Sequence, residues 1–317
     1  MIQINSQVLL QEVRQPVLEK VTAKITEILN SRGFMQEVLR YLSNKKGKMI
    51  RPLLVQLCAS LCGGGVFEDI VDVAAGIELL HMASLVHDDI IDHSDLRRGQ
   101  ATLNNLYGAS VAVLAGDFLF AKAFKLFTKH KGYNLIPTMT DVVCRMCEGE
   151  VNQLVDPVKE EAEYWDYIYD KTACLLGAAC RVGGLLASSE RLDDLEKLGV
   201  LLGYAFQMTD DVLDYYGDPD ILGKRVGDDH AEGIWTLPLI KAKELGVLTS
   251  DWKNLSFKEL RKIIIENDIH SMIAMDVTNI LSQAKQILNS FLIETQEQQK
   301  AKQALTEIAD YILSRNN

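Results

Sequence analysis

The sequence predicts an all-α protein, and three observations support this fold class. Apolar residues recur at spacings of three and four through most of the chain, which is the period of one helix face. No segment shows the alternation of a β-strand, and β-branched residues are mixed with Leu, Ala and Glu. Only six prolines interrupt 317 residues, of which 48% are hydrophobic. We therefore expect one large multi-helix bundle with an extensive core.

The helices of the N-terminal half have recognisable limits. Residues 6–30 carry apolar side chains along one face, which predicts an amphipathic helix. Pro52 is expected to start the next helix, because the first turn tolerates proline, and Gly63-Gly64-Gly65 to end it. Longer helices are predicted over residues 67–92 and 110–130.

The C-terminal half continues the same pattern. A helix is predicted over residues 134–155, before Pro157, and two more over residues 160–189 and 192–216. From Phe257 onward, the spacing indicates two or three shorter amphipathic helices. No stretch rich in Ser, Gly or Pro separates these segments, so the sequence predicts one domain.

Two aspartate clusters of the same form stand out, Asp88-Asp89-Ile90-Ile91-Asp92 and Asp210-Asp211-Val212-Leu213-Asp214. On a helix, the first and fifth residues lie one turn apart on the same face, so each cluster projects carboxylates in one direction. Carboxylates gathered in this way repel one another and call for a cation. Mg²⁺ fits, because it is usually bound by one or two carboxylates together with substrate phosphates.

A single acidic cluster on a helix is more often a solvated face than a site. Here both clusters follow apolar segments, Leu85-Val86-His87 and Tyr204-Ala205-Phe206-Gln207-Met208. Charged side chains are rarely buried without a partner. Two copies in the same buried setting therefore favour a functional site, a Mg²⁺–diphosphate clamp between two helices.

Composition excludes some classes of protein. The net charge of −11 argues against a general nucleic-acid-binding protein, which relies on basic patches. We expect no signal peptide and no transmembrane segment, and therefore a cytoplasmic protein with reduced thiols. Cys144 and Cys147 lack a second pair at zinc spacing, which favours structural thiols.

Basic residues occur beside the predicted breaks, where they could bind phosphate groups. They are Lys48 and Arg51 before a helix, Arg97 and Arg98 after the first acidic cluster, Lys171 beside Thr172, and Lys224 after the second cluster. Arginine binds phosphate oxygens in a bidentate manner, and helix N-termini also favour anions. Any one of these residues alone would be read as a surface cation.

Taken in order along the chain, these motifs resemble the trans-isoprenyl diphosphate synthases, and the resemblance spans nearly all of residues 1–317 as a single polyprenyl synthetase domain. The matching segments are Gly47-Lys48-x-x-Arg51-Pro52, Glu78 to Asp92, Arg97-Arg98-Gly99, Ala115-Gly116-Asp117, Lys171-Thr172, Gln207 to Asp214, Gly223-Lys224 and Thr236 to Ile240. The resemblance implies the all-α isoprenoid synthase fold with a central active-site cavity.

The resemblance also implies a role for each residue. Three Mg²⁺ ions would be coordinated by Asp88, Asp92 and Asp210, with support from Asp89, Asp211 and Asp214. The allylic diphosphate would be bound by Arg97, Lys171 and Lys224, and isopentenyl diphosphate by Lys48, Arg51, His81 and Arg98. Thr172 and Gln207 would direct oxygen dipoles at the allylic cation.

The implied reaction needs no side-chain nucleophile. The allylic C–O bond ionises, the double bond of isopentenyl diphosphate attacks the carbocation, and the released diphosphate is expected to accept the proton. Two positions depart from the family pattern: Met49 and Ile234 stand where Arg and Lys are common, and Lys241 could replace the second cation.

Product length is predicted from the helix that ends in the first cluster. Ala83 and Ser84 occupy positions where short-chain members of the family carry a bulky aromatic residue, and Leu80 and Gly76 continue the same face. The first motif also lacks the two-residue insertion of bacterial farnesyl synthases. Both features imply a hexa- to decaprenyl product, made from farnesyl or geranylgeranyl diphosphate and used for quinone side chains. Phe118 and Phe124 are candidates for the end of the pocket, although ordinary core packing explains them as well.

Several alternatives remain open. A terpene cyclase would usually replace the second cluster with an Asn/Ser/Glu metal motif, and a head-to-head synthase would carry DxxxD-type motifs. The chain could instead be a short-chain synthase, a non-catalytic subunit, or the catalytic subunit of a heteromeric enzyme. All six aspartates are present, which favours a catalytic chain. The resemblance implies a homodimer, for which the helix from Ser110 to Phe127 is a candidate interface.

Overall fold

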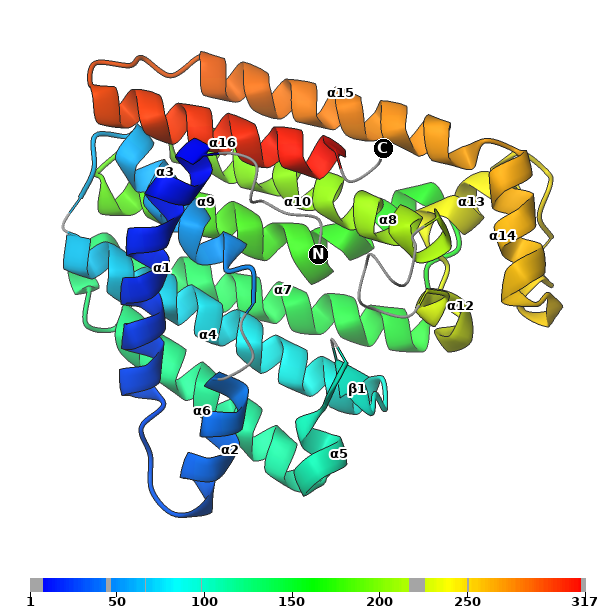
Figure 1. Cartoon of the computed structure of the whole chain (residues 1–317), viewed down its shortest axis with the longest axis horizontal. Coiled ribbons are helices and arrows are strands. Elements are labelled where there is room, and N and C mark those ends of the chain that lie inside the picture. Colours follow the sequence, from blue (N-terminus) through cyan, green and yellow to red (C-terminus); the bar gives the residue numbers. More distant parts are fainter. Residues whose placement is uncertain are drawn as a thin grey trace.

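The computed structural model describes residues 8–43, 47–65, 67–97, 99–216, 226–249 and 251–314. These residues form an all-α bundle (Figure 1). The longer helices are α1 (Val8–Ile28), α2 (Phe34–Ser43), α3 (Ile50–Leu61), α4 (Phe67–Ile91), α6 (Ala109–Phe127), α7 (Leu135–Val155), α8 (Glu161–Ile168), α9 (Cys174–Leu186), α10 (Leu192–Tyr216), α13 (Leu237–Glu244), α14 (Phe257–Glu266), α15 (Ile269–Asn289) and α16 (Gln296–Ser314).

Short elements connect these helices. A two-residue antiparallel ladder pairs β1 (Leu96–Arg97) with β2 (Gln100–Ala101) directly after α4. The remaining short elements are α5 (Leu103–Tyr107), η2 (Lys131–Tyr133), α12 (Asp228–Glu232), η4 (Trp252–Asn254) and a π-helical turn, η3 (Tyr169–Ala173).

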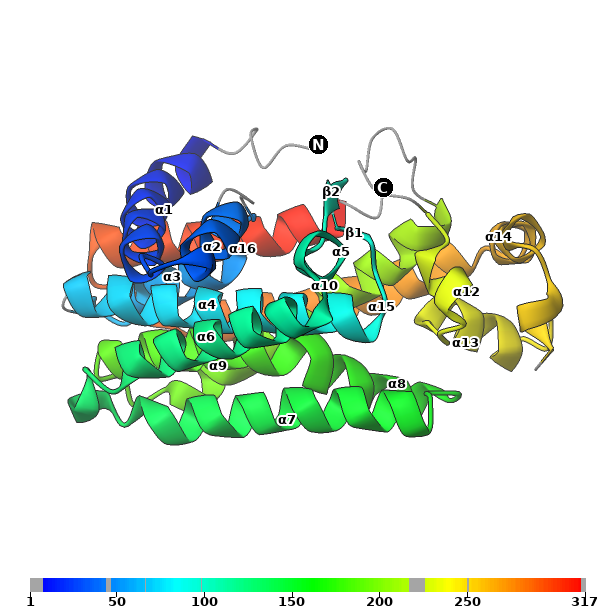
Figure 2. The ribbon, with the colours of Figure 1, turned by 90° about the horizontal axis from the view of Figure 1, so that it is seen from below.

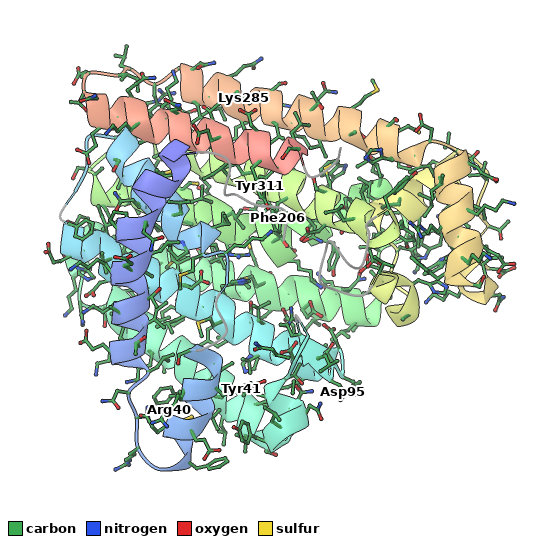
Figure 3. The ribbon with its side chains drawn as sticks, viewed as in Figure 1. Arg40, Tyr41, Asp95, Phe206, Lys285 and Tyr311 are labelled. Atoms are coloured by element: carbon green, nitrogen blue, oxygen red, sulfur yellow. The ribbon has the colours of Figure 1, made fainter. Side chains whose placement is uncertain are left out.

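The helices lie in layers around a common apolar core. Helix α4 packs on α6, α9 packs on α3 and α10, and α10 also packs on α15. Figure 2 shows α7 on one side of the molecule and α1, α2 and α16 on the other. The ion pair of Lys285 with Asp310, 2.5 Å long, joins α15 to α16 (Figure 3). The layered arrangement leaves α4 and α10 in the interior, with their C-terminal ends towards β1 and α12 (Figure 1).

Most predicted helices are confirmed, including the one over residues 192–216. The helix that was predicted to start at Pro52 is α3, which begins at Ile50, two residues before the proline. The predicted helix over residues 160–189 is interrupted by the π-helical turn η3. In the tail, α15 and α16 are long rather than short, because apolar residues from Ile269 to Leu288 keep the helical period over five turns.

Some elements were not predicted. Helices α2 and α5 are short, and the sequence analysis assigned no structure to their residues. The same holds for α12 and α13, which follow the second aspartate cluster. The β1–β2 ladder was missed because two residues are too few to show an alternating pattern.

Helix α4 is apolar enough to raise the question of a membrane span. By length and composition, Phe67–Ile91 could cross a bilayer, but 67% of the apolar window is buried inside the bundle. The helix presents apolar residues on all sides because it is surrounded by other helices. No other helix in the described part of the chain passes the same test.

Glycines allow α9 and α10 to approach closely. A Cβ atom at Gly199 of α10 would lie within 2.7 Å of the Cα atom of Gly177 and clash with the carbonyl oxygen of Leu176. At Gly203, one turn later, it would lie 2.6 Å from the Cα atom of Ala173 in η3. The backbone of η3 is therefore held directly against α10.

We predict that Gly199→Ala destabilises the protein by about 1–3 kcal/mol, because the new methyl group must displace the α9 backbone. This loss outweighs the roughly 1 kcal/mol that alanine gains in helix propensity. Thermal unfolding measures the effect. Gly132→Ala is the matched control, because nothing lies within 4 Å of a Cβ atom there. Equal unfolding temperatures for the two variants would show that the close approach imposes no constraint.

Candidate active site

The first aspartate cluster lies at the C-terminal end of α4. Asp88 and Asp89 are in its last turn, and the backbone N–H of Asp92 donates to the carbonyl oxygen of Asp88 at 2.8 Å. The carbonyl end of a helix carries partial negative charge, which adds to the repulsion among these carboxylates. A cation is therefore strongly favoured at this position.

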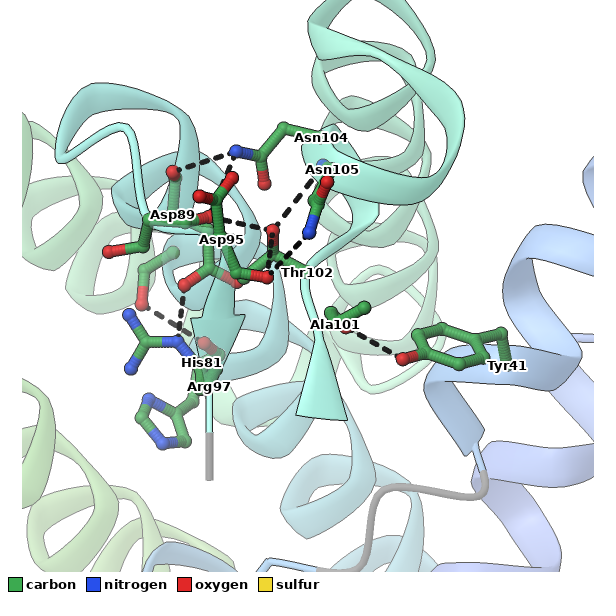
Figure 4. Close-up of polar contacts among 11 residues, drawn as sticks. Tyr41, His81, Asp89, Asp95, Arg97, Ala101, Thr102, Asn104 and Asn105 are labelled. Atoms are coloured by element: carbon green, nitrogen blue, oxygen red, sulfur yellow. Dashed lines mark hydrogen bonds and ion pairs between the residues drawn. The ribbon is translucent and has the colours of Figure 1, made fainter. Parts of the chain in front are cut away.

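Asp89 points into the protein and is held by the β1–β2 ladder. Its side chain is 7% exposed, and Arg97 Nε donates to its Oδ1 at 2.5 Å (Figure 4). Asn104 Nδ2 donates to the backbone oxygens of Asp89 and Ser94, at 3.2 and 3.1 Å. Asp89 therefore fixes the segment after α4 and orients Arg97, while Asp88 and Asp92 are only partly buried.

The second cluster lies near the C-terminal end of α10. Asp211 is buried and accepts hydrogen bonds from Tyr164 Oη at 2.7 Å and Gln207 Nε2 at 2.9 Å. Asp214 is also buried, and its Oδ2 accepts from the backbone N–H of Asp229 at 3.3 Å. Asp210 is partly buried on the same helix. In both clusters, the protein thus satisfies the buried carboxylates itself.

Lys171 connects the two clusters. It lies in η3, and its Nζ donates to Tyr167 Oη at 2.7 Å and is 4.0 Å from Glu150 Oε2 on α7. Its charge acts on Asp88 of the first cluster, while Tyr167 is close enough to Asp211 to feel the charge of the second. The ammonium group therefore acts on the first cluster, and its hydrogen-bond partner Tyr167 lies near the second.

Thr172 and Gln207 are brought together as well. Thr172 Oγ1 donates to Gln207 Oε1 at 2.8 Å, and Gln207 in turn donates to Asp211. This chain of hydrogen bonds joins η3 to α10 and fixes the orientation of the Gln207 amide. Its oxygen atoms are the dipoles that the sequence analysis expected beside an allylic cation.

Burial raises the pKa of one carboxyl group in each cluster. It raises the pKa of Asp88 to about 6, an effect that Lys171 and Arg97 oppose and Glu150 and Asp92 strengthen. Burial also raises the pKa of Asp211, against the hydrogen bonds from Tyr164 and Gln207. Carboxyl groups whose pKa is raised by burial are typical of functional sites. A cation bound beside them would stabilise their charged form.

The donor set fits Mg²⁺ that is shared with a ligand. Within the described residues, no group of three or more His, Cys, Asp or Glu side chains could hold a metal ion by itself. Mg²⁺ commonly takes one or two carboxylates and completes its octahedron with water and phosphate oxygens. Asp88 on α4, Asp92 directly after it and Asp210 on α10 offer oxygen ligands of that type.

The candidates for a second phosphate group lie on α3 and α4. Lys48 precedes α3, and its Nζ donates to Tyr311 Oη of α16 at 3.3 Å. Arg51 is in the first turn of α3, and His81 is on α4 near Arg97 (Figure 4). Met49 between Lys48 and Arg51 adopts a left-handed conformation with φ of 50°, which turns the chain into α3.

Other candidates have different outcomes. Arg98 and Lys224 lie outside the described residues. Lys241, suggested as a replacement for the cation missing at Ile234, has its Nζ 2.5 Å from Glu161 Oε2 of α8. The suggestion that Lys241 serves the site stays a prediction.

The face of α4 predicted to follow the product packs on α6. A Cβ atom at Gly76 would lie 2.5 Å from the ring of Phe127, and Leu80 and Ala83 above it are fully buried. Ser84 Oγ donates to the carbonyl oxygen of His81 at 3.0 Å. Phe127 was not among the two aromatic candidates proposed from the sequence, and its ring contacts this face at Gly76.

Three further residues escaped the sequence analysis: Tyr164, Tyr167 and Glu150. None of the three belongs to a recognisable motif. In sequence, the two tyrosines look like ordinary core side chains of α8. Only the i, i+4 relation between Tyr167 and Lys171 could have suggested one of the contacts.

Comparison with known proteins identifies relatives over most of the chain. Residues 32–256 match the profile of the polyprenyl synthetase family. Octaprenyl diphosphate synthase of Haemophilus influenzae is 34% identical over 325 residues, covering 97% of this chain and 96% of that protein. The enzyme of the same name from Escherichia coli is 40% identical over 241 residues, covering 74% and 72%.

A solved structure is similar over the whole bundle. The polyprenyl synthase from Caulobacter crescentus, complexed with calcium and isoprenyl diphosphate, superposes with a TM-score of 0.87. It is 30% identical in sequence, and the match covers 98% of each chain.

We predict that Asp88→Asn raises the unfolding temperature of the metal-free protein more at pH 8 than at pH 5. Burial raises the pKa of Asp88 to about 6 in the folded state, so the charged form penalises folding increasingly as the pH rises from the ordinary carboxyl pKa to about 6, and fully above it. The amide never carries that charge. Asp141→Asn, at an exposed position of α7, is the control. A variant that is no more stable than the parent at pH 8 would refute the strained state of Asp88.

Proposed function

The chain belongs to the polyprenyl synthetase family, and from this premise we propose that it is a prenyltransferase that makes a long-chain all-trans polyprenyl diphosphate. It condenses isopentenyl diphosphate head-to-tail with an allylic diphosphate, farnesyl or geranylgeranyl diphosphate. The observation that carries this function is the pair of aspartate clusters on α4 and α10, with Lys171 acting on Asp88 of the first. We propose that the product serves quinone side chains and that residues 1–317 form one catalytic domain.

Asp88, Asp92 and Asp210 are the proposed ligands of Mg²⁺, with three ions in the loaded site. The related Caulobacter structure contains calcium and isoprenyl diphosphate, which supports a divalent cation at the same kind of site. Bound Mg²⁺ would stabilise the negative charge that develops on the departing diphosphate. Asp89, Asp211 and Asp214 support the site from inside, since each is buried.

The cations of the chain divide into two sets. Arg97 and Lys171 lie beside the aspartate clusters, which supports a role in binding the allylic diphosphate, together with Lys224. Lys48, Arg51 and His81, with Arg98, are the proposed ligands of isopentenyl diphosphate. Each set compensates anionic oxygens in a chain whose net charge is −11.

The chemical step follows from these placements. The allylic C–O bond breaks, and its electron pair leaves with the diphosphate, whose charge Lys171 and Arg97 stabilise. The oxygens of Thr172 and Gln207 face the resulting carbocation. The double bond of isopentenyl diphosphate forms the new C–C bond, and diphosphate takes the proton that is lost.

Product length is proposed to depend on the α4 face that packs on α6. Ala83 offers only a methyl group close to the aspartates, so the growing tail can pass it. Further along α4, the ring of Phe127 lies against Gly76, where a side chain would not fit. We propose that this ring, and not Phe118 or Phe124, marks the end of the tail pocket.

Assembly is proposed from the exposed apolar residues of α6 and α7. Val113 and Leu114 are exposed on α6, and Val151, Leu154 and Val155 on α7. A second copy of the chain would cover them in a homodimer, and sedimentation equilibrium distinguishes dimer from monomer. A heteromeric enzyme with a small partner is the alternative. We propose a cytoplasmic location with no membrane span and no nucleic-acid partner.

The proposed function predicts that the purified chain, given Mg²⁺, labelled isopentenyl diphosphate and farnesyl diphosphate, extends the primer to a long product. Chromatographic sizing of the dephosphorylated products measures this. Products that stop at geranylgeranyl diphosphate would indicate a short-chain synthase. Binding of both substrates without extension would contradict a stand-alone enzyme and favour one that needs a partner.

If the tail follows this face of α4, Ala83→Phe should shorten the product by several isoprene units, because the ring would block the tail close to the aspartates. Phe127→Ala should lengthen it by removing the contact with Gly76. The same sizing assay checks both variants. Unchanged product lengths in both would show that the tail does not follow this face of α4.

A further inference from the structure

The partners of Lys171 point to a residue whose role has not been assigned. Its Nζ donates to Tyr167 Oη at 2.7 Å and lies 5.2 Å from the centre of the same ring. We propose that Tyr167 is a positioning residue for prenyl transfer, which holds the Lys171 ammonium group beside the first aspartate cluster, ready for the allylic diphosphate. This inference rests on the proposed function of the site.

A lysine at this position needs to be held. Its side chain has four rotatable carbons and about 2 kcal/mol of rotamer entropy, so it does not keep one position unaided. Carboxylates attract it from two sides, Asp88 on α4 and Glu150 on α7. Pairing with Asp88 would neutralise a proposed metal ligand, and closer pairing with Glu150 would draw the ammonium away from the substrate.

A phenol can hold the ammonium group of Lys171 without neutralising its charge, whereas a carboxylate would neutralise it. The hydroxyl oxygen of Tyr167 accepts a hydrogen bond from Nζ but carries no charge, so Lys171 keeps its full positive charge for the diphosphate. An ammonium group has three donors, of which Tyr167 uses one. The remaining donors are then available to anionic oxygens on the side of Asp88.

The local backbone makes the contact rigid. Tyr167 is near the end of α8, and Lys171 follows four residues later in the π-helical turn η3, so the two side chains lie on one face. Ala173 in η3 packs directly on Gly203 of α10, and Thr172 is bonded to Gln207. π-Helical turns are frequent at functional sites, where they redirect side chains.

Helix α8 supplies a second hydroxyl of the same kind. Tyr164, three residues before Tyr167, donates to Asp211 Oδ2 at 2.7 Å. Tyr164 therefore contacts the carboxylate of Asp211, and Tyr167 contacts the ammonium group of Lys171. Helix α8 is anchored by its N-terminal capping box and by the ion pair between Glu161 and Lys241.

The test is Tyr167→Phe, which keeps the ring and removes only the hydroxyl oxygen. We expect the KM for the allylic diphosphate to rise about tenfold, while the KM for isopentenyl diphosphate stays the same. Tyr169→Phe is the matched control, because Tyr169 contacts Arg145 and Tyr204 rather than Lys171. It should leave both constants unchanged. Equal effects of the two variants would overturn the proposal.

A double-mutant cycle separates positioning from a general structural effect. If Tyr167 acts through Lys171, then Tyr167→Phe should cause no further loss in a Lys171→Met background. A further loss of the same size there would overturn the proposal. Thermal unfolding of every variant verifies that the fold is retained.

The proposed function and this inference can fail separately. If the parent protein extends no primer, the proposed function fails, and calorimetry with Mg²⁺ and inorganic diphosphate then tests Tyr167 alone. Weaker diphosphate binding by Tyr167→Phe than by Tyr169→Phe would support the positioning role. Equal binding would overturn it.

Discussion

Carboxylates gather at the C-terminal ends of two buried helices, and this crowding of negative charge constrains the rest of the site. Asp88 and Asp92 close α4, and Asp210 and Asp214 occupy the last turns of α10, where the helix ends are themselves negative. Such an arrangement is unfavourable in the absence of a cation. It is tolerated because the bundle around it buries a large apolar core, and it is typical of a site where charge stabilisation is needed for function.

The protein divides the carboxylates into two groups. Asp89, Asp211 and Asp214 are buried and bonded to Arg97, to Tyr164 and Gln207, and to a backbone N–H group. Burial favours the neutral form of Asp88, and the charges of Lys171 and Arg97 oppose this effect only from a distance. The first group fixes positions, and the second remains available to a metal ion and a diphosphate.

The sequence predicted the helices that carry the clusters, because α4 and α10 have long, regular apolar patterns and the aspartates stand out against them. It did not predict the π-helical turn around Lys171, because this turn, which packs against Gly203, leaves no local sequence pattern. Tyr167 and Phe127 were missed for a related reason. An aromatic residue in a helix looks the same in sequence whether it fills the core, holds a lysine or closes a pocket.

We infer that the clusters on α4 and α10 bind one metal–diphosphate unit between them. A crystal structure with Mn²⁺ and an unreactive thiolo analogue of farnesyl diphosphate is the decisive experiment, because anomalous scattering locates the ions. Ions between the diphosphate and Asp88, Asp92 and Asp210, with Lys171 on the same diphosphate, are the predicted result. Ions at only one cluster, or a diphosphate bound away from Lys171, would contradict the account.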